Sequence, residues 1–158
     1  MDFVDKTLLR ILQHHAKTTN VELARKSNLA PSSTLERVRR LEERGVISGY
    51  RAVLDPSKLG YQLQAMVLIT LSHHQVASID RFEERIRAIR EAVACYHLTG
   101  QYDYLVHLVV RDMDHLGEVI KHTIGGIQGV EKQETLLALS TVKAFDGYSL
   151  DVMPEDDV

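Results

Sequence analysis

Two short helical patterns lie back to back between residues 20 and 45, and this arrangement narrows the possible folds more than any other feature. Thr19 and Glu22 have the spacing of a capping box, so a helix is predicted to begin there. Pro31 lies where the first turn of a following helix tolerates proline, and Gly45 lies where that helix is expected to end. The two patterns predict helices joined by a tight turn. The apolar positions expected to face inward on the later helix are Leu35, Val38 and Leu41.

Residues on both sides of this pair complete a unit that spans residues 1–52. An apolar stripe at Val4, Leu8, Ile11 and Leu12 predicts an earlier helix of roughly 12 residues. Residues 46–54 are rich in β-forming side chains around Ser48-Gly49, and they predict a small two-stranded hairpin. Three helices followed by a β wing are the layout of a winged helix-turn-helix.

Positive charge is concentrated on the third predicted helix, which has four arginines between residues 37 and 44. Residues 1–60 carry 11 basic and 7 acidic side chains, whereas residues 61–158 carry 8 and 15. This asymmetry favours a polyanion as the partner of the N-terminal unit. A recognition helix places such residues in the major groove of double-stranded DNA, where arginine pairs with guanine and hydroxyls hold phosphates. The alternative is an ordinary solvated face, because Glu42 and Glu43 lie among the arginines. The predicted DNA-binding residues are Ser32, Ser33, Thr34, Glu36, Arg37 and Arg40.

Composition argues against several other classes of protein. No apolar run approaches the ~20 residues of a membrane-spanning helix, and residues 1–5 are acidic where a secretion signal would be basic. Cys95 is the single cysteine, so an internal disulfide is impossible and a reducing compartment is expected. No motif for nucleophilic or acid–base catalysis is recognised. The expected protein is cytoplasmic, is not an enzyme, needs no cofactor and is not bound to a membrane.

From residue 63 onward the periodicity alternates between strand and helix. Strands are predicted at residues 64–71, 92–98, 104–110 and 130–139, and helical stripes at 79–89 and 116–124. The order βαββαβ is that of a ferredoxin-like split, in which a four-stranded antiparallel sheet carries both helices on one face. The fold class is therefore α+β. The expected boundaries are a linker at 53–62, this domain at 63–150 and a flexible acidic tail at 151–158.

The strand predicted at residues 104–110 is apolar at nearly every position. A sheet that is apolar on both faces needs a cover on each face, and the two predicted helices cover only one. No further element of the chain remains for the other face. A second copy of the chain is the expected cover, so the protein is predicted to be at least a homodimer.

Several segments in order resemble the Lrp/AsnC family, the leucine-responsive and asparagine-responsive (feast/famine) regulators. The matching segments are DKTLLRIL (5–12), TNVELARKSNLAPSSTLERVRRLEERGVISGY (19–50), LDPSKLGY (54–61), TGQYDYL (99–105) and GVEKQETLLAL (129–139). The resemblance implies a sequence-specific transcription regulator, associated with the prokaryotic nucleoid, that responds to an amino acid or a related small molecule. It also implies a RAM-type C-terminal domain that binds the effector and assembles dimers, often into an octamer.

The resemblance places the effector in a cleft between dimers, near the loop that contains Asp103. A zwitterion needs an acceptor for its ammonium group and donors for its carboxylate, which Asp103 and amides near Gly100 can supply. The alternative for Asp103 is an ordinary turn aspartate. The predicted effector-binding residues are Thr99, Gly100, Tyr102, Asp103, Thr135 and Leu137.

Two other functions are compatible with the sequence. One is an architectural DNA-binding protein of the nucleoid that has no effector. The other is a metal-responsive regulator, since Cys95 and His97 share one face of a predicted strand and His107 lies on the next strand. The chain also departs from the family at Ala30, where a serine is usual, and alanine has no side-chain group that caps a helix.

Overall fold

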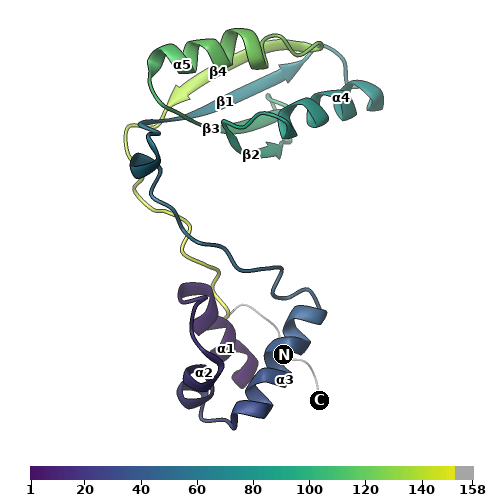
Figure 1. Ribbon diagram of the computed structural model, residues 1–158. Coiled ribbons are helices and arrows are strands. Elements are labelled where there is room, and N and C mark those ends of the chain that lie inside the picture. Colours follow the sequence, from purple (N-terminus) through teal and green to yellow (C-terminus); the bar gives the residue numbers. More distant parts are fainter. Residues whose placement is uncertain (152–158) are drawn as a thin grey trace. The chain divides into compact units, whose positions relative to one another are not determined.

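The computed structural model describes residues 1–151, which divide into two compact units (Figure 1). Among the described residues, one unit contains Met1–Val53 together with residues 143–151, and the other contains Leu54–Val142. The expected C-terminal domain reached residue 150, whereas the chain from Lys143 lies with the first unit. Apart from Asp151, the acidic tail expected at 151–158 lies outside the described residues.

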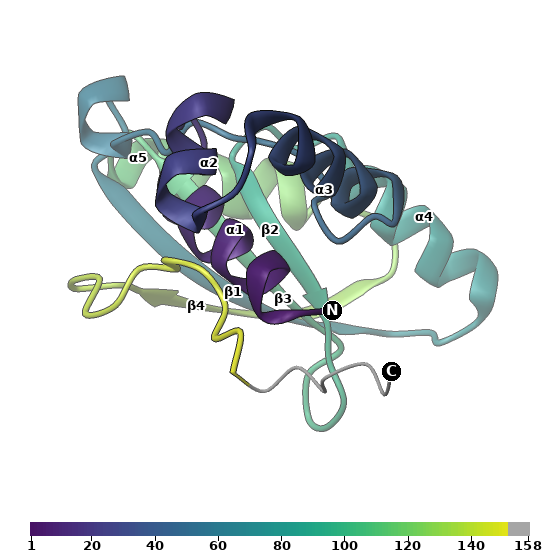
Figure 2. The same ribbon diagram turned by 90° about the horizontal axis from the view of Figure 1, so that it is seen from below.

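The first unit contains three helices, which Figure 2 shows gathered around one another. They are α1 (Phe3–His14), α2 (Asn20–Ser27) and α3 (Pro31–Glu43). Asp2 caps α1 by accepting a hydrogen bond from the Asp5 amide, and Thr19 caps α2 by accepting one from the Glu22 amide. Ala30 lies in an extended conformation at the N-cap position of α3, and its side chain forms no capping hydrogen bond. The capping box at Thr19 and Glu22 therefore predicted where α2 begins, and Pro31 predicted the start of α3.

The small core of this unit differs from the prediction on α3. Leu8, Leu12 and Leu23 form its centre, with partly buried Val38 packed against them. Leu35 is 59% exposed, while the neighbouring Thr34 is completely buried. The buried stripe of α3 is thus Thr34, Val38 and Leu41, which repeat at intervals of four and three residues. The sequence pattern was wrong at this point because hydrophobicity alone favours leucine over threonine for an inward position.

The expected hairpin at residues 46–54 is absent, because no described residue between 44 and 62 lies in a strand. The amides of Val46 and Ile47 instead donate to the carbonyl of Leu41 and so complete the end of α3. Tyr50 is tied to the same helix, since its hydroxyl donates to Glu42 at 2.7 Å. Val53 is 99% exposed and packs on no partner strand. An isolated two-stranded hairpin is only marginally stable, which explains why strand propensity did not suffice here.

Residues 143–151, here called the C-terminal strap, lie against α1 within the first unit. The side-chain amide of Gln13 donates to the Tyr148 carbonyl at 3.2 Å and accepts from the Tyr148 amide at 3.0 Å. His14 lies 3.3 Å from Asp146, and Arg10 lies 3.3 Å from Asp151. These contacts explain why the strap is part of this unit.

The second unit has the predicted βαββαβ order. Its strands are β1 (Leu63–Leu71), β2 (Ala92–His97), β3 (Tyr104–Val110) and β4 (Val130–Leu137), and they lie in the antiparallel order β2-β3-β1-β4. The helices are α4 (Val76–Arg87) and α5 (Met113–Glu118), and α5 continues into a π-helical segment at Val119–Ile124. A short 3-10 turn at Pro56–Leu59 precedes β1. The sheet with its two flanking helices, seen in Figure 1, confirms the α+β prediction.

The two faces of the sheet differ in burial. Along β1, Ala65, Val67, Ile69 and Leu71 are buried under the helices, and the side chains between them are only partly buried. Antiparallel pairing places directly opposed residues on the same face. The other face, here called the open face, therefore carries the apolar side chains of Met66, Leu68, Tyr96, Leu105 and Leu136.

Candidate DNA-binding face and effector site

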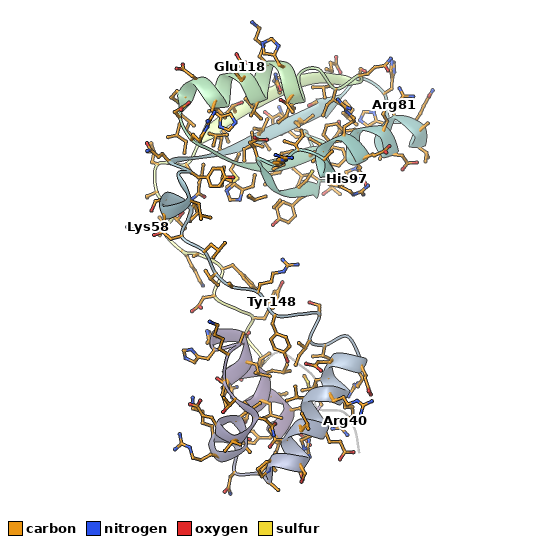
Figure 3. The ribbon with its side chains drawn as sticks, viewed as in Figure 1. Arg40, Lys58, Arg81, His97, Glu118 and Tyr148 are labelled. Carbon is orange, nitrogen blue, oxygen red and sulfur yellow. The ribbon has the colours of Figure 1, made fainter. Side chains whose placement is uncertain are left out.

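The exposed side of α3 carries most of the residues predicted to bind DNA. Ser32, Ser33, Glu36 and Arg40 are exposed, and Figure 3 marks Arg40 on this helix. A shallow hollow of about 220 Å³ is lined by Ser33, Glu36, Arg37 and Arg40. Four of the predicted residues are therefore brought together on one surface.

Thr34 does not belong to this surface. Its side chain is fully buried, and its hydroxyl donates to the carbonyl of Ala30 at 3.1 Å. A residue without exposed surface has no atom to offer to a base or a phosphate. The prediction of Thr34 as a DNA-binding residue is therefore wrong, and the cause is the same phase error that placed Leu35 inside.

Arg37 is held by two carboxylates from the beginning of α1. Its Nη1 donates to Asp2 at 2.6 Å and to Asp5 at 2.8 Å. These two hydrogen bonds, of which that to Asp5 is the stronger influence, raise the pKa of Arg37. Asp2 has a lowered pKa, because hydrogen bonds from the Asp5 amide and Arg37 outweigh the opposing effect of partial burial. No local pattern in the sequence indicated this cluster, since 32 residues separate Asp5 from Arg37.

The loop between β2 and β3 contains the other predicted site. Thr99 and Gly100 are exposed, and Gly100 has a φ of +118°, a conformation that favours glycine. Tyr102 is partly buried, and its hydroxyl donates to Glu134 on β4 at 2.6 Å. Lys132 lies 5.9 Å from the centre of the same ring. The loop is thereby connected to the edge strand β4 through two residues that the sequence did not single out.

Asp103 already has partners for both of its carboxylate oxygens. Oδ2 accepts from the Leu71 amide at 2.7 Å, and Oδ1 lies 2.9 Å from Nε2 of His74. Partial burial acts to raise the pKa of Asp103, but the hydrogen bonds from Leu71 and His74 outweigh it and hold that pKa below its usual value. Asp103 is thus an anionic acceptor in the loop, and one of its two carboxylate oxygens is paired with His74. No local pattern in the sequence indicates that His74 pairs with Asp103, because the two residues lie 29 positions apart.

Thr135 and Leu137 do not join the other four predicted residues. They pair with Val67 and Ala65, which places them on the helix-covered face at the exposed edge of β4. Glu134, one position away, pairs with Leu68 and reaches Tyr102 from the open face. The structure therefore assembles Thr99, Gly100, Tyr102 and Asp103, and leaves Thr135 and Leu137 apart from them.

A second hollow, of about 430 Å³, lies between α4 and β2, and its walls include Glu83, Arg87, Cys95, His97 and Tyr104. Glu83 accepts from the Tyr104 hydroxyl at 3.1 Å, and His97 stacks on the Tyr104 ring at 4.6 Å. Burial raises the pKa of Cys95 and the pKa of Tyr104, the latter to about 12. The thiol is therefore a poor nucleophile at neutral pH.

The residues considered for a metal site are separated by the sheet. Cys95 pairs with Val106 on the helix-covered face, whereas His107 pairs with Met66 and Ala94 on the open face. Within residues 1–151, no group of three or more histidine, cysteine, aspartate or glutamate side chains is placed to hold a metal ion. In the same part of the chain, no helix is both long and apolar enough to cross a membrane.

Comparisons with known proteins agree with both units. A winged helix-turn-helix DNA-binding profile matches residues 1–48, and the Lrp/AsnC ligand binding domain profile matches residues 64–147. The leucine-responsive regulatory protein of Haemophilus influenzae is 36% identical over 143 residues, which are 90% of this chain and 86% of that protein. The transcriptional regulator AzlB of Bacillus subtilis is 33% identical over 153 residues, covering 97% of this chain and 98% of its own.

Solved structures give the same result. A transcriptional regulator of Neisseria meningitidis in complex with L-Met has a TM-score of 0.92 and 28% identity, covering 96% of this chain and 97% of its own. An AsnC family regulator of Agrobacterium tumefaciens also has a TM-score of 0.92, with 30% identity over 98% of this chain and all of its own. Full-length similarity of sequence and fold leads to one conclusion. The chain belongs to the Lrp/AsnC family of transcription regulators.

Proposed function

We propose that this regulator binds operator DNA through α3 and that an amino acid bound near Asp103 changes this binding. The observation that carries the proposal is the presence of an exposed, arginine-bearing helix in one unit and an anionic loop in a separate ligand-binding unit. The relative crystallised with L-Met supports an amino acid as the effector class. Such a regulator works in the cytoplasm, on the DNA of the nucleoid.

On the DNA side, Ser33, Glu36 and Arg40 are the residues assigned to base edges, and Ser32 to the phosphates at the start of α3. Arginine recognises guanine with two hydrogen bonds, and a serine hydroxyl at a helix start suits a phosphate oxygen. A dimer presents two such helices, so the operator is expected to contain a repeated or palindromic half-site.

On the effector side, Asp103 receives the ammonium group, and amides at Gly100 receive the carboxylate. The exposed conformation of Gly100 leaves its backbone accessible to a small ligand. Oδ1 of Asp103 is paired with His74, whose side chain is exposed. The incoming ammonium group takes the place of His74 at this oxygen. Oδ2 keeps its hydrogen bond to Leu71 throughout.

The open face supports self-association as the mode of assembly. Tyr96 is 57% exposed and Leu136 is 48% exposed on this face, and Met66, Leu68 and Leu105 beside them are only partly buried. A second copy places the same apolar side chains opposite and removes both surfaces from water. We infer a homodimer through this face, with assembly of dimers to an octamer as the larger form.

Calorimetric titration of the standard amino acids into the wild type and into Asp103→Asn tests the effector. Asparagine keeps an acceptor for Leu71 but lacks the charge that pairs with ammonium, so affinity is expected to fall about tenfold or more. Asp80→Asn, an exposed aspartate on α4, is the matched control and is expected to bind as the wild type does. Equal binding by Asp103→Asn would remove Asp103 from the site, and no binding of any amino acid by the wild type would overturn the effector class.

A further inference from the structure

The middle of the proposed DNA-binding face is occupied by an ion-pair cluster that belongs to the protein itself. Asp5 lies in the first turn of α1 and is only 2% exposed. Its Oδ1 accepts from Arg37 at 2.8 Å, and its Oδ2 lies 3.6 Å from Nη2 of Arg40. Asp2 accepts from the same nitrogen of Arg37 and also caps α1. Two helices are thus joined through one guanidinium group.

Stability is a weak explanation for this cluster. Taking charges out of water offsets most of the attraction between them, and apolar replacements of buried ion pairs are often equally stable. What a buried pair supplies is geometry, because a guanidinium bound by two carboxylates at short distance has little freedom to rotate. The cluster therefore fixes the rotation and the position of α3 relative to α1.

The row of residues on α3 shows what this fixed position serves. Ser33, Arg37 and Arg40 follow one another at intervals of four and three residues and so share one side of the helix. The side chain of Arg37 is 28% exposed, whereas that of Arg40 is 53% exposed. Arg40 touches the same Asp5 only through a longer contact, so most of its guanidinium group faces solvent. The inner arginine holds the helix, and the outer arginine is available to DNA.

We propose that Arg37 is a positioning residue, which acts through buried Asp5 to orient Arg40 and Ser33 for base recognition, and does not itself contact DNA. The proposal refines the DNA-binding function, on which it rests. It differs from the prediction from the sequence, in which Arg37 contacts DNA directly.

The two roles of Arg37 make opposite predictions for a change at Asp5. If Arg37 contacts DNA, Asp5 competes with the DNA for it, so Asp5→Asn leaves binding unchanged or tightens it. If Arg37 positions the helix, Asp5→Asn frees the Arg37 guanidinium group and α3 is no longer held in place. Specific binding then weakens, as it does in Arg37→Gln. The sign of one measurement therefore separates the two roles.

The experiment uses the full-length chain, a duplex that the wild type selects from random-sequence DNA, and a scrambled duplex of equal length. Affinity is measured at several salt concentrations for Asp5→Asn, Arg37→Gln and the double variant. Arg39→Gln is the charge-matched control, because Arg39 lies on α3, is largely exposed and forms a local ion pair with Glu43 at 2.8 Å. Thermal unfolding monitored by circular dichroism gives the folded fraction at the assay temperature, and affinities refer to that fraction.

Positioning predicts that Asp5→Asn and Arg37→Gln each weaken binding to the selected duplex by at least about fivefold, the loss expected for one misplaced bidentate contact. The double variant is expected to bind no worse than either single variant, because both act through one cluster. Binding to the scrambled duplex should change no more than in Arg39→Gln.

Direct contact would instead reveal itself by undiminished binding of Asp5→Asn, or by a salt slope lowered by about one in Arg37→Gln. Either result overturns the positioning role. Should Asp5→Asn fail to fold, Asp2→Asn decides, since asparagine preserves the helix cap and removes the more exposed carboxylate. A lower ratio of selected to scrambled affinity in Asp2→Asn supports positioning, and an unchanged or higher ratio contradicts it. A wild type that selects no duplex would refute the DNA-binding function itself, which is a separate outcome.

Discussion

The carboxylate of Asp103 accepts a hydrogen bond from the backbone amide of Leu71 at 2.7 Å, so the loop proposed to hold the effector also completes the end of β1. The neighbouring Asp103 amide donates to the carbonyl of Ile69 at 2.8 Å. At the end of the ladder between β1 and β3, the Leu71 amide thus bonds to the Asp103 side chain and not to a backbone carbonyl of β3. Ligand binding and strand termination depend on the same aspartate.

Asp103→Asn is expected to lower stability at neutral pH by about 0.5–1.5 kcal/mol, because a neutral amide is a weaker acceptor for the Leu71 amide. The pKa of Asp103 is lowered in the folded chain, so its charge contributes stability above the unfolded pKa of about 3.9. That contribution is lost as the pH falls through the lower folded value, and the two proteins should then converge. Urea unfolding at several pH values checks this, and a difference that persists in acid would contradict it.

Thr34→Val is expected to leave DNA affinity unchanged, because the side chain is buried and has no surface for DNA. Its stability should change by less than about 1 kcal/mol, since the lost hydrogen bond to Ala30 is offset by burial of a methyl group. Ser33→Ala, the neighbouring exposed position, serves as the comparison and is expected to weaken binding in a gel-shift titration. Weaker binding by Thr34→Val with an unchanged unfolding curve would return Thr34 to the DNA-binding face.

Ala30→Ser is expected to stabilise the first unit by about 0.5–2 kcal/mol. Ala30 has the extended conformation of a helix cap, with φ −70° and ψ 144°, and its side chain is exposed, so a serine hydroxyl has room to accept a free amide of the first turn. Thermal unfolding measures the gain. Ala30→Val, which adds bulk without an acceptor, should show none, and equal effects of the two substitutions would exclude capping as the cause.

Gly147→Ala is expected to detach the C-terminal strap from α1. Gly147 has a φ of +107°, and an added Cβ would lie 2.5 Å from Oε1 of Gln13, the atom that accepts from the Tyr148 amide. Backbone strain alone costs about 1–2 kcal/mol, and loss of the paired hydrogen bonds adds to it. Hydrogen exchange of the α1 amides should therefore accelerate.

Gly45→Ala is the matched control for the strap, because Gly45 also has a positive φ, of +70°, but its added Cβ would meet nothing within 4 Å. Gly45→Ala should therefore lower stability by the backbone strain alone, without the clash that the added Cβ makes with Gln13 in Gly147→Ala. In a Gln13→Ala background, Gly147→Ala is expected to cost less than in the wild type. An equal cost in both backgrounds would show that the contact between Gln13 and the strap contributes nothing.

Leu68→Glu is expected to disrupt self-association, because Leu68 lies on the open face and a charge there resists burial against a second copy. Light scattering should report at least twice the 17.9 kDa chain mass for the wild type and a smaller species for the variant. Leu139→Glu provides the control, since Leu139 is completely exposed beyond the end of β4. A wild type that remains monomeric at micromolar concentration would refute the inferred dimer.

Local signals in the sequence determined the three helices of the first unit and the βαββαβ order of the second, although they also predicted a hairpin at residues 46–54 that the structure lacks. The Thr19–Glu22 capping box, the proline at the start of α3 and the alternation of β1 each act within a few residues, so periodicity and capping suffice to place them. The βαββαβ order followed directly from these elements. The family resemblance then indicated which two surfaces carry function.

Tertiary structure alone decided which side chains on those surfaces are available. Arg37 and Asp5, Asp103 and Leu71, and Gln13 and Tyr148 are joined across 32, 32 and 135 residues of sequence. Thr34 and Leu35 exchange the expected inside and outside positions through a rotation of one residue on α3. Such outcomes depend on which distant groups meet when two elements pack, and a hydrogen bond or a buried stripe between them leaves no periodic trace in the chain.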